Sequence, residues 1–154
     1  MGDQSLPAKP RPRATPVSEP FWEGLQAGVL RLQRCGDCRT WVHYPRLRCT
    51  ACLSDNLTWE EVEASGTLYA ATIARQATAA PFADEVPQVI AVVELSQGTR
   101  ITTTLTDAGD SLPPVGAPVE GVIDRGPDGI ALLRFRLRPD GAAGSAPNHL
   151  STVS

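Results

Sequence analysis

The chain has 154 residues, of which 42% are hydrophobic and 20% charged, with a formal net charge of -3. This length suits one domain of ordinary size, or a small domain joined to a metal-binding module. No apolar run approaches the length of a membrane span. The acidic balance disfavours a general nucleic-acid binder, which needs a basic excess to gain from phosphate contacts. We therefore expect a soluble, cytoplasmic protein that acts without a membrane.

The N-terminal region combines a proline-rich stretch with a short amphipathic segment. Residues 1–17 have no apolar period and are expected to form a disordered leader. A helix is expected to begin near Ser18, because serine caps helix N-termini well. Phe21 and Leu25 share one face at i, i+4 spacing, with Trp22 beside them. Two alternatives are open: this face packs on its own domain, or Phe21 and Trp22 contact a partner.

All four cysteines lie in two Cys-x2-Cys pairs, Cys35 with Cys38 and Cys49 with Cys52. Two such pairs can supply four thiolates to a tetrahedral site, and soft thiolates favour zinc over magnesium, calcium or manganese. Iron in a rubredoxin-type site is the main metal rival. Two disulfides or four buried thiols are further alternatives. The chain has no apolar signal segment before the motif, so a reducing compartment is expected, and this disfavours the disulfides. Because four protein ligands leave no open position, the metal is expected to be structural.

Short extended stretches flank the cysteine pairs. Residues 29–34 alternate leucine with polar residues, residues 41–45 return towards the second pair, and residues 57–62 lead onwards. These stretches predict two hairpins around one metal, a rubredoxin-like zinc ribbon. With the short helix, the ribbon is expected to occupy residues 18–62. His43 is interpreted as a partly exposed strand residue rather than a ligand or a catalytic group.

The rest of the chain predicts a mainly β fold. Five strands rich in β-branched residues are expected at residues 67–74, 89–95, 101–105, 119–123 and 130–137. Turn residues separate several of these strands, as at Gly98 and in the Gly-Pro-Asp-Gly sequence of residues 126–129. This spacing fits a five-stranded OB-fold barrel over residues 63–138.

The last predicted strand has two chemically different faces. Leu133, Phe135 and Leu137 are expected to face the core. The alternate residues would form a basic outer stripe; they are Arg134, Arg136 and Arg138. The glycine-, alanine- and serine-rich residues 139–154 are expected to be a disordered tail.

No catalytic constellation appears in the sequence. It contains no phosphate-binding glycine loop, and its histidines have no motif-like nucleophile or acid beside them. The adjacent carboxylates Asp84 and Glu85 are better interpreted as a solvated turn than as an acid/base pair. Four arginines flank the cysteines and form either a solvated face or a clamp for a phosphate-bearing ligand such as coenzyme A; they are Arg34, Arg39, Arg46 and Arg48. The chain alone is therefore expected to be a zinc-stapled binding module.

Seven motifs in fixed order carry a resemblance to a known family. They are Pro20-Phe21-Trp22, Leu32-Gln33-Arg34-Cys35-Gly36-Asp37-Cys38, Tyr44-Pro45-Arg46, Cys49-Thr50-Ala51-Cys52, Gly66-Thr67-Leu68-Tyr69, Pro81-Phe82-Ala83-Asp84-Glu85-Val86-Pro87 and Val89-Ile90-Ala91-Val92-Val93-Glu94-Leu95. Over residues 18–137 this order resembles the acyl-CoA-associated zinc-ribbon/OB-fold proteins, the domain-of-unknown-function family thirty-five. The knuckles depart from the family pattern by lacking the glycine that often follows the second cysteine, and the second knuckle lacks its frequent proline.

The resemblance implies an accessory subunit rather than an enzyme. Such proteins bind thiolase-fold partners: acyl-CoA thiolases, acyltransferases or aldolases, in hetero-oligomers where the partner carries the catalytic residue. The small subunit stabilises the assembly and helps to hold the coenzyme A thioester. Candidate contacts with the partner or with coenzyme A are Phe21, Trp22, Arg46, Arg48 and Phe82, and no catalytic residue is assigned.

Two further expectations concern the barrel. Phe82 lies among small residues and prolines that limit its freedom, so the loop 77–87 is expected to reach the active-site mouth of the partner. The alternative class is a single-stranded nucleic-acid binder, since zinc ribbons and OB folds serve that purpose too. Such a protein needs aromatics on the barrel face, but Tyr69 is the only aromatic residue in the first three predicted barrel strands. A zinc-dependent hydrolase is disfavoured by the closed ligand set.

Overall fold

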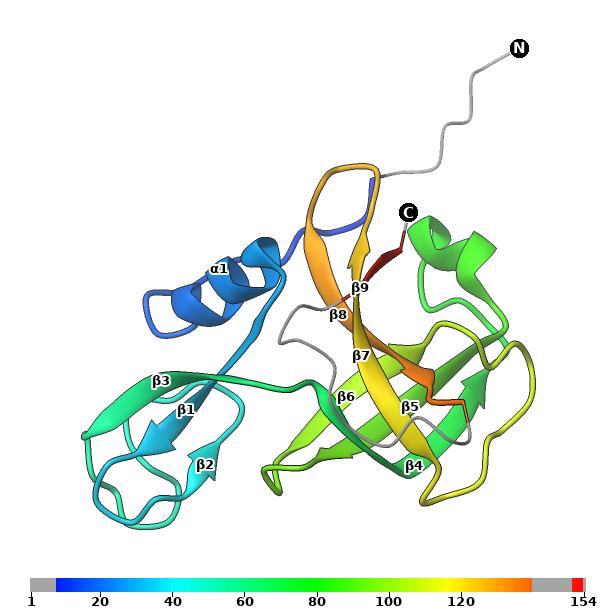
Figure 1. The fold of residues 1–154 in the computed structure, drawn as a ribbon. Coiled ribbons are helices and arrows are strands. Elements are labelled where there is room, and N and C mark those ends of the chain that lie inside the picture. The colour runs from blue at the N-terminus through cyan, green and yellow to red at the C-terminus, as the bar shows by residue number, and fades with distance from the viewer. Residues whose placement is uncertain (1–7, 140–150, 154) are drawn as a thin grey trace.

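The computed structural model describes residues 8–139 and 151–153. Figure 1 shows a short helix and a small three-stranded sheet on one side of a larger β-barrel. No helix among the described residues is long and apolar enough to cross a membrane. The expectation of a mainly β chain with a helix, a ribbon and a five-stranded barrel is confirmed.

Helix α1 (Glu19–Ala27) begins after Ser18, as predicted. The Ser18 side chain does not cap the helix; its Oγ instead accepts a hydrogen bond of 2.9 Å from the backbone N–H of Thr15. Leu25 is buried against the barrel residue Ile123. The apolar face of the helix therefore packs on its own chain, which is the first of the two alternatives stated above.

The ribbon sheet consists of β1 (Leu30–Cys35), β2 (Trp41–Val42) and β3 (Leu57–Val62), in the order β2-β1-β3 with antiparallel pairing. Strand β2 is shorter than the expected stretch of residues 41–45, because the chain leaves the ladder after Val42.

The barrel consists of β4 (Ser65–Ala74), β5 (Gln88–Leu95), β6 (Arg100–Leu105), β7 (Pro118–Arg125) and β8 (Ala131–Leu137). Neighbouring strands follow the order β4-β5-β6-β8-β7, and antiparallel pairing of β4 with β7 closes the barrel. The contact between β6 and β8 is parallel. A short 3-10 helix, η1 (Ala80–Glu85), interrupts the loop between β4 and β5.

The structure describes part of each end for which disorder was expected. Residues 8–17 have no regular helix or strand, yet they follow a defined path along the barrel, where Arg11 pairs with Asp128 at 3.6 Å. Residues 151–153, expected in the tail, form β9 (Ser151–Val153), which pairs in parallel with β7. The remaining parts of both predictions, residues 1–7, 140–150 and 154, lie outside the described residues.

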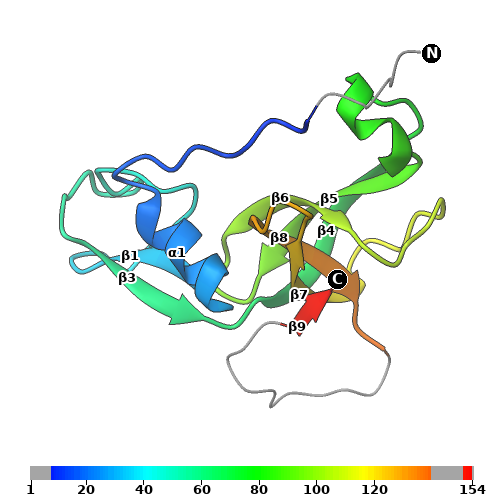
Figure 2. The same cartoon turned by 90° about the horizontal axis from the view of Figure 1, so that it is seen from above.

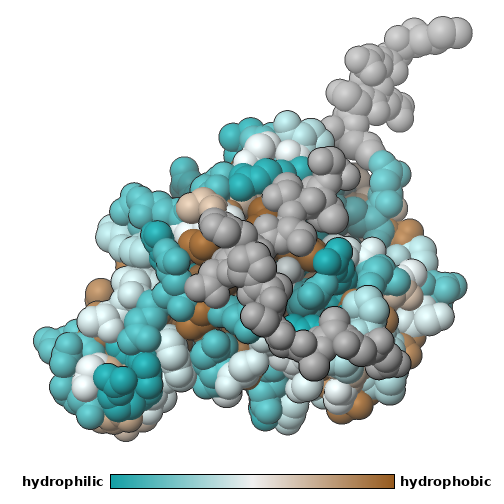
Figure 3. Space-filling model, in the orientation of Figure 1, coloured by the Kyte–Doolittle hydropathy of each residue, from teal (hydrophilic) through white to brown (hydrophobic). Residues whose placement is uncertain are grey.

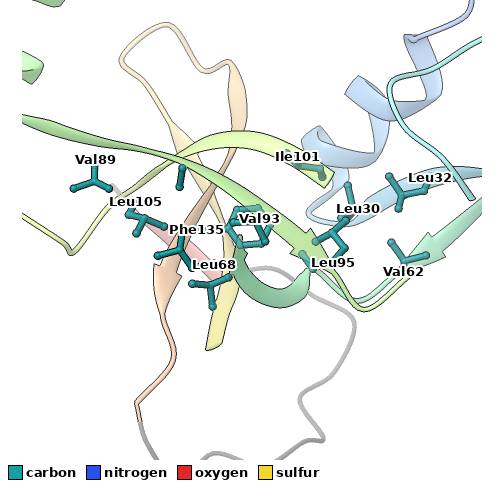
Figure 4. Close-up of a cluster of buried hydrophobic side chains, with 13 residues drawn as sticks. Leu30, Leu32, Val62, Leu68, Val89, Val93, Leu95, Ile101, Leu105 and Phe135 are labelled. Carbon is teal, nitrogen blue, oxygen red and sulfur yellow. The ribbon is translucent and has the colours of Figure 1, made fainter. Parts of the chain in front are cut away.

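One hydrophobic cluster runs through both the ribbon and the barrel. Leu30, Leu32 and Val62 from the ribbon strands belong to the same buried cluster as Val93 and Phe135 of the barrel. Figure 4 shows these side chains as a continuous group that extends from the barrel interior towards the ribbon. The ribbon is therefore fixed to the barrel by packing.

The basic stripe expected on the last strand is neutralised within the chain, which corrects the prediction. Each arginine of the stripe has a carboxylate partner: Arg134 with Asp124 at 2.5 Å, Arg136 with Glu120 at 2.6 Å, and Arg138 with Glu63 at 3.6 Å. Two of these acids lie on the adjacent strand β7, where antiparallel pairing aligns them with β8. The inward side is as predicted: Phe135 is fully buried, and Leu133 and Leu137 pack against the core.

The barrel closure leaves no space for a side chain at Gly66, which pairs with β5 on one side and β7 on the other. A Cβ atom at this position would lie 2.1 Å from the carbonyl oxygen of Glu94. We expect Gly66→Ala to lower the free energy of unfolding by about 3 kcal/mol, because backbone atoms cannot move aside as a flexible side chain can. Chemical denaturation measures the change. The exposed neighbour Thr67→Ala serves as control and should change the stability by less than about 0.5 kcal/mol; equal stability of the two variants would contradict the prediction.

Candidate metal centre and the adjoining groove

The four cysteine sulfurs form one compact cluster at the end of the ribbon. All four Sγ atoms lie within 4.8 Å of one another, with 3.6 Å between Cys35 and Cys52 and 3.5 Å between Cys38 and Cys49. A tetrahedral zinc site with Zn–S bonds of about 2.3 Å separates its sulfurs by about 3.8 Å, whereas a disulfide bond measures about 2.05 Å. The distances therefore fit four ligands of one metal ion and do not fit disulfides.

The local chain path brings the two knuckles together. Strand β1 ends at Cys35, and the turn that follows passes so close to Asn56 that a Cβ atom on Gly36 would lie 2.5 Å from the Asn56 amide nitrogen. Asp37 accepts hydrogen bonds from Ser54 and Asn56, which lower the pKa of its carboxyl group. These contacts tie the first knuckle to the chain that leaves the second.

The electrostatics of the cluster favour a cation at its centre. Hydrogen bonding to the side chain and backbone of Thr40 lowers the pKa of the Cys38 thiol to about 6. A backbone hydrogen bond at Ser54 acts in the same direction on Cys52, but the neighbouring sulfurs of Cys38, Cys35 and Cys49, together with burial, raise the pKa of that thiol to about 12. Four thiolates this close repel one another, so a divalent cation is what allows all of them to ionise. The donor set fits zinc, which would hold the two knuckles together as a structural staple.

The four arginines near the cysteines divide into two kinds. Arg34 stacks on Trp41 at 4.7 Å and pairs with Glu60 at 3.4 Å, so its guanidinium is engaged within the chain. Arg48 donates a hydrogen bond of 3.1 Å to the carbonyl oxygen of Leu53. The side chains of the other two, Arg39 and Arg46, are exposed.

A groove of about 550 Å³ lies where the helix, the ribbon and the barrel meet. Its walls come from α1, from the segment after β2 and from strands β6 and β8, and residues 13–18 contribute one edge. Both aromatic residues singled out on the helix line it, and the rings of Phe21 and Trp22 contact each other edge to face at 5.3 Å. Pro45 and Leu132 add further apolar surface.

His43 is a groove residue that is partly exposed, as expected, but lies just outside a strand. It lies outside β2 and is half-buried, with its ring 5.8 Å from Phe21 and 4.1 Å from Tyr44. Burial lowers the pKa of His43 to about 4. The imidazole is therefore neutral at pH 7, and its Nε2 atom is buried without a hydrogen-bond partner among the described residues.

Phe82 lies far from the metal centre. It belongs to η1, which Figure 2 places at the opposite end of the molecule from the ribbon. The ring is half-buried, with the ammonium of Lys9 at 5.9 Å, and the same lysine pairs with Glu85. The structure thus brings Phe21 and Trp22 together in the groove and places Arg46 and Arg48 at the ribbon, with Phe82 apart from both sets.

These features define the class as a zinc-ribbon/OB-fold protein. Two family models match the chain: the ChsH2 rubredoxin-like zinc ribbon domain over residues 22–58 and the ChsH2 C-terminal OB-fold domain over residues 59–124. A DUF35 domain-containing scaffold protein of Methanocaldococcus jannaschii is 32% identical over 113 residues, which cover 69% of this chain and 78% of that protein. The chain belongs to the DUF35 family.

Other similar proteins include subunits of enzymes. A protein of Thermomonospora curvata, named probable enoyl-CoA hydratase alpha subunit, is 34% identical over 72% of this chain; the chain spans about a third of that relative, 34% of its length. A chain of a solved structure titled Ltp2-ChsH2(DUF35) aldolase superposes with a TM-score of 0.74 and 29% identity, covering 82% of this chain and 98% of that one. A DUF35 protein of unknown function from Sulfolobus solfataricus shares the fold, with a TM-score of 0.55, 17% identity, and coverage of 80% of this chain and 86% of that one.

The metal centre generates a prediction about Cys49, which is fully buried within the cluster. Replacing it in Cys49→Ser removes one of four ligands, so zinc content should fall from about one ion per chain to near zero. Hydrogen exchange should then accelerate around the two knuckles, whose own buried cluster is small, and stay slow in β5, whose buried residues belong to the larger shared core. Thr50→Ala is the control, since this exposed residue between the cysteines offers no sulfur ligand. Full zinc content in Cys49→Ser would contradict the assignment.

Proposed function

We propose that this chain is a cytoplasmic, non-catalytic accessory subunit that binds a thiolase-fold enzyme acting on acyl-CoA thioesters and forms a hetero-oligomer with it. The observation that carries the proposal is the cluster of four cysteine sulfurs, which closes the metal site and leaves no position for substrate. The likeness to a DUF35 chain in an aldolase structure, and to a protein named as an enoyl-CoA hydratase subunit, supports an enzyme as the partner. Four unpaired thiols at metal-binding distances suit a reducing compartment.

The accessory role follows from rigidity. A metal-stapled ribbon that shares a core with the barrel presents a surface of fixed shape. Such a surface loses little conformational freedom when it binds, so more of the contact energy stabilises the complex.

The groove is the proposed place where this chain helps to hold the acyl-CoA. Its volume of about 550 Å³ lies within the range of small-molecule sites. Trp22, Pro45 and Leu132 provide apolar walls suited to an acyl or pantetheine chain, and Arg13 lies at the edge, where a phosphate could be met.

The alternative function is binding of single-stranded nucleic acid. Proteins of this kind combine exposed aromatic faces with a continuous basic groove. The ring of Tyr69 on the barrel is covered by the guanidinium of Arg100 at 3.5 Å, and Arg100 pairs with Glu94 at 2.9 Å. The arginines of β8 are paired with acids as well. These contacts favour the accessory-subunit function over the alternative.

The test is purification of the tagged full-length chain from its native host, with identification of the bound protein by mass and sizing of the complex. We expect a thiolase-fold protein in stoichiometric amount, whose acyl-CoA reaction requires this chain. Recovery of the chain alone, or with nucleic acid that survives moderate salt, would contradict the proposal. Binding of labelled single-stranded oligonucleotides at low salt should be weak or absent.

Phe82 provides a second test of the same function, because η1 carries it at the edge of the barrel. In Phe82→Ala the lost aromatic contact should weaken the complex about tenfold or slow its turnover, as expected for one interface anchor. Affinity is measured by calorimetry on the reconstituted complex, and turnover by acyl-CoA consumption. Val115→Ala is the control, since Val115 is 73% exposed in another loop. Unchanged affinity and rate in Phe82→Ala would remove this loop from the interface.

A further inference from the structure

Two residues of the metal knuckles hold a backbone conformation that suits glycine. Arg39 and Leu53 each follow the second cysteine of a pair, and their φ angles are +64° and +63°. Glycine adopts this left-handed region without steric cost, whereas a side chain with a Cβ atom is strained there. Leu53 is 69% exposed, so its side chain gains little from packing within the chain. The chain thus retains a strained leucine whose apolar surface remains in water.

More exposed apolar residues lie in the same short segment. Leu47 is 78% exposed and Tyr44 is 52% exposed. Arg39, Arg48 and Leu53 are each adjacent to a cysteine, and since the four sulfurs lie within 4.8 Å, these residues surround one centre. Tyr44 lies at the groove, so it is left out of the set that we call the knuckle face: Arg39, Arg46, Leu47, Arg48 and Leu53.

The arginines of the knuckle face differ from those of the barrel. Arg100, the two arginines of β8 and the adjacent Arg138 all pair with carboxylates. Among the described residues, no carboxylate pairs with the arginines of the knuckle face. The nearby acid Asp37 is hydrogen-bonded to Ser54 and Asn56, and Asp55 is an exposed acid close to the second knuckle. The knuckle face therefore combines apolar side chains with guanidinium groups that have no carboxylate partner of their own.

We infer that the knuckle face is the surface by which this chain docks on its enzyme partner, and that the partner presents an apolar pocket bordered by carboxylates. The inference rests on the proposed function and adds to it the docking surface and its chemistry. Arginine is a typical anchor of interface centres, docking would remove the apolar surface of the two leucines from water, and carboxylates are the partners that exposed arginines bind most strongly. Docking relieves the exposure of Leu53 without further ordering of the metal-held backbone.

A different explanation accounts for the arginines alone. A zinc ion with four thiolates carries a net negative charge, which neighbouring guanidinium groups would offset. That explanation gives no reason for exposed leucines at positions 47 and 53, one of them in a strained backbone. The leucines therefore discriminate between the two explanations.

The experiment measures the dissociation constant between the full-length zinc-loaded chain and the thiolase-fold protein that copurifies with it. Leu53→Gly should raise or leave unchanged the thermal midpoint, because it removes the left-handed strain, and yet weaken the complex at least tenfold. Leu47→Ser, which does not adjoin a cysteine, should also weaken the complex at least tenfold with full zinc content. Leu112→Ala is the matched control, since Leu112 is an apolar residue 55% exposed on the barrel side; its affinity should not change.

The outcomes separate this inference from the proposed function. A wild-type chain that forms no complex with a thiolase-fold protein overturns both. A wild-type complex that both leucine variants form within twofold of normal affinity overturns the docking surface alone. If Leu53→Gly loses zinc, its affinity for the partner is not informative, and the affinity of Leu47→Ser alone decides whether the docking surface is correct. The inference is also overturned if the leucine variants change only the self-association of this chain. It is overturned as well if arginine variants such as Arg39→Gln change only the retention of zinc.

Discussion

The cluster of buried side chains that the ribbon and the barrel share determines the rest of the structure. Leu30 and Leu32 alternate on β1 and enter the same core as Phe135, so the ribbon cannot turn freely relative to the barrel. Helix α1 directly precedes β1 in the chain, and its Leu25 is buried against Ile123 and Ala131 of the barrel strands β7 and β8. The groove exists because these three elements are held at fixed positions around it.

The metal centre compensates for the small hydrophobic core at the knuckle end of the ribbon. Beyond the shared core, its buried interior consists of Val42 and the cysteines Cys35 and Cys49, with Leu57 packed against them. So small a cluster contributes too little hydrophobic free energy to order two knuckles, and a structural metal is the usual remedy. The difference in size between the large shared core and the small knuckle cluster explains why the knuckles need a metal and the barrel does not. It also explains why residues beside the cysteines can remain exposed without loss of order.

Local patterns predicted most of the fold, because strand alternation and cysteine spacing are properties of nearby residues. The strand over residues 57–62 was predicted with its exact bounds, and the five barrel strands were found within two residues at each end. What the sequence could not predict depends on distant residues. The carboxylate that pairs with Arg134 belongs to Asp124 on the neighbouring strand β7. The partial burial of His43 requires helix α1 to pack beside it. Strand β9 is too short to show a pattern of its own.

The positions of the proposed contacts constrain how a partner can bind. Figure 2 places the ribbon strands at one end of the molecule and the 3-10 helix η1 at the other. The groove is lined by residues of α1, β6 and β8. A single partner that touches both ends must therefore extend along the chain and cover the region between them. The face drawn in Figure 3 carries mainly hydrophilic residues, with several apolar ones among them. An acyl chain in the groove would then be enclosed by both proteins, which gives an accessory subunit a direct influence on substrate binding without any catalytic residue of its own.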